Sequence, residues 1–205
     1  SVNGGVDEPS KQTRLPWLNS TLAANDEVIA PYTPIELKGN SLSILGRRLE
    51  IADNGLPKQV TTYFSNSMTR LDNVGKPILT SGFDFQVLKT GLTPYRLAPS
   101  GKVQIWKIAD GAAAWTASSA DEFFTLDVTG RLEFDGYVQY TMKLTALRDV
   151  RLGDARLKIP IRKPFAKFMM GLGQRGGVRP PNFNWTWDVA TKNQDGAWIG
   201  GVNGG

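Results

Sequence analysis

Residues 138–146 alternate strictly between apolar and polar side chains. The apolar members of this run are Val138, Tyr140, Met142, Leu144 and Ala146. Successive side chains of a β-strand point to opposite faces, so the pattern predicts a long strand with one face in the core and the other in water. A strand of this kind needs paired neighbours and a second layer over its apolar face. This run therefore favours a layered β-sheet fold.

The flanking residues continue the β pattern. Asp135 and Gly136 are typical of a tight turn, and we expect them to join the 138–146 strand to a strand at 124–134 in a hairpin. A second run, 155–162, alternates aliphatic residues with Arg156, Lys158 and Arg162, which we expect to face water. We predict that the apolar residues of the two runs line the core: Val138, Tyr140, Met142, Leu144, Leu157, Ile159 and Ile161.

The rest of the chain consists mostly of short β-type segments separated by turn residues such as Gly39-Asn40 and Asn54-Gly55. Only 164–170, which begins with a proline and precedes Gly171, is compatible with a helical turn. We predict an all-β fold, an antiparallel β-sandwich of roughly 10–14 strands with almost no helix.

The expected domain organisation is simple. Residues 1–16 are polar and rich in Gly and Pro, and we expect a flexible lead-in there. Residues 17–205 are expected to form a single β-sandwich domain, with 171–205 as a long terminal loop region rich in Gly and Trp.

The composition excludes several kinds of chemistry. The chain has no histidine and no cysteine, which rules out Ser-His-Asp and Cys-His catalysis, disulfides, and His- or Cys-ligated metals. We expect no metal and no cofactor. A pair of carboxylates would be the one glycosidase chemistry left. Asp26-Glu27 and Asp121-Glu122 are adjacent in sequence and would point to opposite faces of a strand. Asp188 and Asp195 share the terminal loop and could converge, but capping hydrogen bonds within the loop are the favoured role for them. We therefore assign no catalytic residue.

Charge is concentrated in one region of a chain with a net charge of +5. Basic residues outnumber acidic ones between Arg148 and Arg179, as they would on the wet face of a strand. Nucleic-acid binding is the alternative, but few aromatic residues lie nearby for base stacking, and we expect no nucleic-acid partner. No apolar run approaches the roughly 20 residues of a membrane helix, so we expect no membrane insertion.

The terminal region carries the best candidates for a contact surface. Trp185 and Trp187 would share one face of an extended backbone, with amides and carboxylates beside them. Flat rings beside short polar groups suit a sugar, and they suit equally an ordered loop packed against a neighbouring domain. The candidates for glycan or interdomain contact are Trp185, Trp187, Asp188, Asn193, Asp195 and Trp198. Spacing alone does not choose between these roles.

A resemblance to a known family narrows the choice. The motifs that carry it in the terminal region are Gly171-Leu-Gly-Gln-Arg-Gly-Gly-Val-Arg-Pro180, Trp185-Thr-Trp-Asp188 and Lys192-Asn-Gln-Asp-Gly-Ala-Trp-Ile-Gly200. Shorter ones precede them: Trp17-Leu-Asn-Ser20, Pro31-Tyr-Thr-Pro34, Asp53-Asn-Gly-Leu-Pro57 and Glu133-Phe-Asp-Gly136. Together they resemble the N-terminal β-sandwich domain of bacterial proteins similar to glycoside hydrolase family 123.

The resemblance implies a non-catalytic module that supports a downstream catalytic barrel in a longer, exported protein and contributes to glycan binding. The family's catalytic acids lie in the barrel, so none is implied here. The implied partners are that catalytic domain and an oligosaccharide, and the implied location is periplasmic or extracellular. A stand-alone carbohydrate-binding module that uses Trp185, Trp187 and Trp198 is the alternative.

Overall fold

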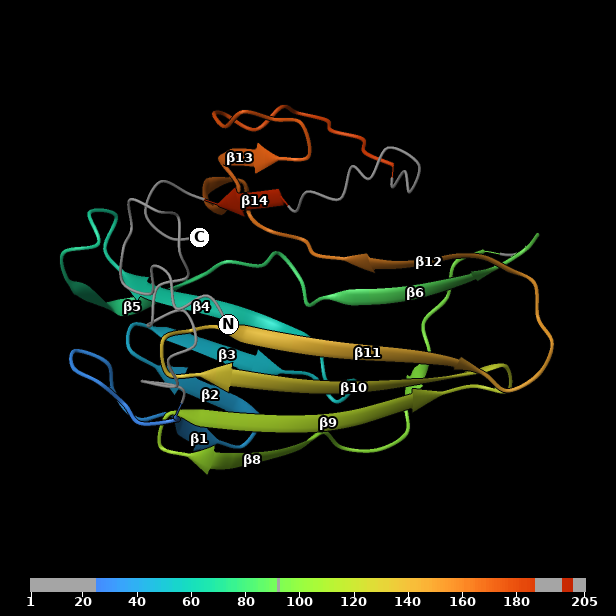
Figure 1. The fold of residues 1–205 in the computed structure, drawn as a ribbon, viewed down its shortest axis with the longest axis horizontal. Coiled ribbons are helices and arrows are strands. Elements are labelled where there is room, and N and C mark those ends of the chain that lie inside the picture. The colour runs from blue at the N-terminus through green and yellow to red at the C-terminus, as the bar shows by residue number, and fades with distance from the viewer. Residues whose placement is uncertain (1–24, 92, 187–196, 201–205) are drawn as a thin grey trace, which may run out of the picture.

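The computed structural model describes residues 25–91, 93–186 and 197–200 of the 205-residue chain, with the backbone alone for Ala197 and Trp198. Within these ranges the chain forms fourteen strands and one short 3-10 turn, and all strand pairings are antiparallel. The predicted all-β, antiparallel sandwich is confirmed, at the upper end of the expected number of strands (Figure 1).

The first large sheet is a meander in which neighbouring strands follow one another in sequence. Its strands are β1 (Glu36–Lys38), β2 (Ser41–Ile44), β3 (Arg47–Ile51), β4 (Pro57–Phe64) and β5 (Leu71–Pro77). Leu42 pairs with Leu49, and Leu49 pairs with Val60, so one face of the sheet carries a continuous apolar row. The predicted turns at Gly39 and Gly55 are present, and both glycines have positive φ, which a glycine adopts without strain.

The second large sheet contains the strand from which the β fold was predicted. Its strands are β7 (Ala98–Pro99), β8 (Gln104–Ala109), β9 (Ala112–Ala120), β10 (Phe124–Glu133) and β11 (Val138–Ala146). β10 lies between β9 and β11, and β7 and β8 both pair with β9. The predicted β10–β11 hairpin is confirmed. Its turn is fixed by Gly136 at positive φ and by Asp135, whose carboxylate accepts a hydrogen bond from the Tyr137 amide.

Two smaller sheets complete the fold. β6 (Asp84–Lys89) pairs with β12 (Leu152–Lys158), and β13 (Phe168–Gly171) pairs with β14 (Ala197–Gly200). The expected helical turn at 164–170 is only partly correct. A 3-10 turn spans Lys163–Phe165, but from Phe168 the chain is extended because its backbone pairs with β14 and Val178. Long-range pairing overrides the local preference there.

The core lies between the layers in two clusters. The first joins the apolar row of β2 and β3 to Trp115 of β9 and Leu132 of β10. The second joins Val87 of β6 to Phe124 and Leu126 of β10. The half-buried members of β11 pack against these clusters, as the alternating pattern predicts: Val138, Tyr140, Met142 and Leu144.

Two residues that we predicted to line the core do not. Leu157 is 40% exposed and Ile159 is 47% exposed, whereas Ile161 is half-buried and bridges to Leu79. Leu157 pairs with Phe85 and so shares the face that β6 turns toward the core. β12 lies on the far side of β6 from β11 (Figure 1), and no layer covers that face among the residues the structure describes. The alternating sequence pattern identified the apolar face of β12 correctly, but it could not show whether another layer covers that face.

Arg156, Lys158 and Arg162 are exposed, as expected. In the described part of the chain, no helix is long and apolar enough to cross a lipid bilayer.

Candidate functional site

The six residues nominated for glycan or interdomain contact are described only in part. Trp185 is half-buried, and the backbone of Trp198 pairs with Met170 across β13 and β14. Trp187, Asp188, Asn193 and Asp195 lie outside the described residues, as does the side chain of Trp198. The convergence of these groups on one surface therefore stays a prediction.

A cleft of about 680 Å³ lies beside this region, and we call it the β4–β14 cleft. Its walls are β4 from Val60 to Phe64, the segment Ile161–Lys167, and Ile199 and Gly200 of β14. This volume falls within the usual range of small-molecule sites, which is about 300–1,000 Å³. The cleft thus joins the terminal region to the face of the first sheet.

The register of the first sheet explains why the cleft exists. Val60 pairs with the core residue Leu49, and Thr62 and Phe64 follow on the same face because side chains alternate along a strand. Val60 packs against the core and also lines the cleft, and Thr62 and Phe64 continue the cleft lining. Gly136, in the turn of the β10–β11 hairpin, also lines it. The cleft is a continuation of the core face past the end of the second layer.

Cationic side chains gather around Phe64 in the cleft. The guanidinium of Arg47 lies over the Phe64 ring, with its carbon 5.6 Å from the ring centroid. Lys76 donates to the carbonyl oxygen of Phe64 at 3.2 Å and to the Asn66 side chain at 3.4 Å. Lys167 is a third cationic lining residue. None of the described lining residues is an aspartate or a glutamate.

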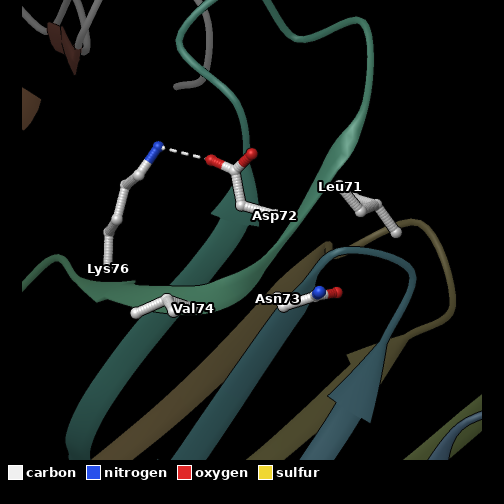
Figure 2. A pocket seen from close by; sticks show the side chains of 5 residues that line it. All are labelled: Leu71, Asp72, Asn73, Val74 and Lys76. Carbon is white, nitrogen blue, oxygen red and sulfur yellow. Dashed lines mark hydrogen bonds and ion pairs between the residues drawn. The ribbon is translucent and has the colours of Figure 1, made fainter.

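Lys76 has a carboxylate partner outside the cleft. Figure 2 shows the side chains of Asp72 and Lys76 pointing toward one another from β5, and their ion-pair distance is 3.0 Å. The hydrogen bond from Lys76 lowers the pKa of Asp72 below its usual value. These two residues, with Leu71, Asn73 and Val74, line a second hollow of about 440 Å³. All five belong to β5, so this hollow has no described opposing wall and is the weaker candidate for a ligand site.

Two of the carboxylates weighed as catalytic candidates, Asp26 and Asp121, have structural roles in the described residues. Asp26 forms an ion pair with Arg131. Burial acts to raise the pKa of Asp121, but the amides of Phe123 and Phe124 donate to its carboxylate at 2.7 Å and the net pKa is lowered. An aspartate held in this way is a loop cap and a weak proton donor at neutral pH. Within the described ranges, no three acidic, histidine or cysteine side chains gather as metal ligands would.

The sequence patterns did not predict the β4–β14 cleft. Arg47, Phe64 and Lys76 belong to three different strands, and none lies in a recognisable motif. Their proximity depends on where the second layer ends, which local periodicity does not report.

Comparison with known proteins gives one match. A family model described as "Glycoside hydrolase 123, third domain" matches residues 35–205. No curated protein sequence and no solved structure matches the chain.

Proposed function

The chain belongs to the family of glycoside hydrolase 123 third domains, and from this premise we propose that it is a non-catalytic module of a longer glycoside-hydrolase-like protein. Its role is to support a catalytic barrel and to contribute one wall of a glycan site. Placement N-terminal to that barrel, export to the periplasm or cell exterior, and a bacterial source are parts of the same proposal.

One surface carries the supporting role in this proposal. Leu152, Ala155 and Leu157 lie on one face of β12, and Ile159 follows two residues after Leu157. We call these four residues the β12 face. Leu152 is 45% exposed, and Leu157 and Ile159 are exposed to a similar degree. Contiguous apolar side chains on a protein surface typically mark a contact with another protein or domain.

The position of β12 also supports a contact with a neighbouring domain. In the described residues β12 pairs with β6 alone and is an edge strand, so one row of its backbone groups is open to pairing or packing. Uncovered edges with apolar side chains promote aggregation unless another element protects them. A neighbouring domain of the same protein would provide that protection. The β12 face is the observation on which the supporting role rests.

The basic residues near β12 support the absence of a nucleic-acid partner in this proposal. Arg156 forms an ion pair with Asp154, and Arg162 donates to the carbonyl oxygen of Leu79 at 3.1 Å. Cations that are already engaged in this way are poorly suited to neutralise phosphates. We propose neither nucleic-acid binding nor membrane insertion.

The β4–β14 cleft favours a second candidate function, that of a carbohydrate-binding module. Ile199 and Gly200 line the cleft, and they directly follow Trp198, one of the three tryptophans proposed to bind sugar with Trp185 and Trp187. In this alternative the chain binds glycan without a catalytic partner. Glycan binding by the isolated chain, together with indifference of the parent enzyme to changes on the β12 face, would favour it.

The supporting role can be tested in the parent protein. Leu157→Asp with Ile159→Asp should lower hydrolysis of a chromogenic hexosaminide and the thermal stability of the barrel, because charges would disrupt the contact. Trp106→Asp on β8 is the matched control, since Trp106 is an exposed apolar residue on the edge of the other sheet. Equal effects of the two changes would overturn the proposal. Hydrolysis by the 205-residue chain alone would show that it is itself a glycosidase.

A further inference from the structure

The charged side chains that line the β4–β14 cleft in the described residues are all hydrogen-bond donors. Its charged members are Arg47, Lys76 and Lys167, and the guanidinium and ammonium groups donate hydrogen bonds but cannot accept them. A neutral sugar offers hydroxyls that both donate and accept, and it is best matched by a site that supplies acceptors as well. An excess of cationic donors is instead suited to a ligand with an excess of acceptors, such as a carboxylate.

The balance of charges in the cleft also favours an anionic ligand. The charge of Lys76 is offset by Asp72. Arg47 is half-buried, and in the described residues it forms no ion pair. Its guanidinium lies over the Phe64 ring. Lys167 likewise has no ion-pair partner within the described ranges and lies over the Phe168 ring. Because Arg47 is partly buried, its lack of a counterion is costly, whereas Lys167 is exposed. A ligand carboxylate would reduce the cost at Arg47.

The remainder of the lining suits the body of a sugar ring. Phe64 and Phe165 provide aromatic surface, and Ile161 and Ile199 provide aliphatic surface, for the apolar CH face of a pyranose. Thr62 and Ser65 provide hydroxyls that can accept as well as donate. The volume of about 680 Å³ accommodates one or two sugar units with water.

We propose that the β4–β14 cleft binds a carboxylated sugar, a uronic acid unit of an oligosaccharide, with Arg47 as the main partner of the carboxylate. This inference rests on the proposed contribution to glycan binding and names its ligand class and site. It does not depend on docking through the β12 face. A negative result for ligand binding in the cleft would therefore not contradict docking through the β12 face, and the reverse also holds.

The test uses the 205-residue chain and three probes in isothermal titration calorimetry: digalacturonate, its neutral counterpart galactobiose, and acetate. Digalacturonate should bind about tenfold or more tightly than galactobiose, and acetate should bind far more weakly than both, because only the first supplies ring and carboxylate together. Binding should weaken as salt is raised. Equal affinity for the two disaccharides, or acetate binding as well as digalacturonate, would overturn the proposal.

Variants locate the site. Arg47→Gln should reduce digalacturonate affinity about tenfold or more, since it removes a charged hydrogen bond, and Arg47→Lys should restore part of it. Arg48→Gln is the matched control, because it makes the same change one residue away, on the opposite face of β3, where the guanidinium lies over Tyr63. Circular dichroism checks that each variant is folded. Equal losses for Arg47→Gln and Arg48→Gln, or no loss for either, would place the ligand elsewhere.

Discussion

Trp115 illustrates how single residues fix the interior of this sandwich. Its ring is fully buried, and its indole N–H donates to the Gly55 carbonyl oxygen at 2.8 Å, which ties β9 to the turn between β3 and β4. Gly130 pairs directly with Trp115 on one side and with Tyr140 on the other. The missing side chain leaves room for the indole, which also meets Tyr140 edge-on at 5.5 Å between ring centroids.

Gly130→Ala should destabilise the fold by about 1–3 kcal/mol, because an added Cβ would overlap the Trp115 ring and force it to move. Gly101→Ala is the control, since a Cβ there would meet nothing within 4 Å, and its effect should stay within about 0.5 kcal/mol. Urea unfolding measures both. A neutral Gly130→Ala would mean that the indole does not lie over this position.

At the scale of elements, β11 and β12 show what alternation can and cannot predict. Both patterns identified the apolar face of the strand. β11 lies over the core, so its large apolar residues are half-buried, whereas the β12 face is left uncovered in the described residues. Whether another layer covers the apolar face of a strand depends on the order of the strands and on how far each sheet extends. Both arise from pairings between distant segments.

The terminal region and the β4–β14 cleft also show which features a sequence pattern can predict and which it cannot. The glycine-rich composition of the terminal region corresponds to positive φ angles at Gly171, Gly173, Gly176 and Gly177, because glycine adopts this conformation without strain. The pairing of β13 with β14 was not predicted, because neither segment has a clear strand pattern. The clustering of Arg47 with Phe64 and Lys76 was equally out of reach, since it depends on strand register and on the end of the second layer.

The contrast between buried and uncovered leucines can be measured. Leu126→Ala on β10 should cost about 2–5 kcal/mol, because Leu126 is 3% exposed and its truncation would leave a cavity. Leu157→Ala on the β12 face should change the unfolding free energy of the 205-residue chain by less than about 1 kcal/mol. Similar costs for the two would mean that β12 is covered within this chain.

At the scale of the whole molecule, acid sensitivity follows from a set of engaged carboxylates. Hydrogen bonds from Lys102, Lys76 and Arg96 lower the pKa values of Asp53, Asp72 and Asp84 respectively. A carboxyl whose folded pKa is depressed stabilises the fold fully above its unfolded value of about 3.9, and this contribution is lost as the pH falls through the folded pKa. The chain has no histidine to titrate near neutrality.

The melting temperature should therefore change little between about pH 5.5 and 7.5 and should fall below about pH 4. Circular dichroism melts across this range provide the measurement. A clear step in melting temperature between about pH 6 and 7 would contradict the assignment of these carboxylates as the main pH-dependent groups.

The supporting role proposed for the chain makes β12 the part of the molecule that should differ most between isolated and natural contexts. In the part of the chain that the structure describes, β12 is an exposed edge strand, so its outward amides should exchange readily in the isolated chain. Packing of a catalytic barrel on the β12 face would bury these groups. β8, an edge strand of the other sheet with exposed Trp106 and Ile108, should be unaffected.

Amide hydrogen–deuterium exchange, compared between the 205-residue chain and the full-length parent protein, tests this most directly. Exchange in Leu152–Lys158 should slow by about tenfold or more in the parent, while exchange in Gln104–Ala109 should stay the same. Unchanged exchange in Leu152–Lys158, or equal slowing in the two strands, would contradict docking through the β12 face.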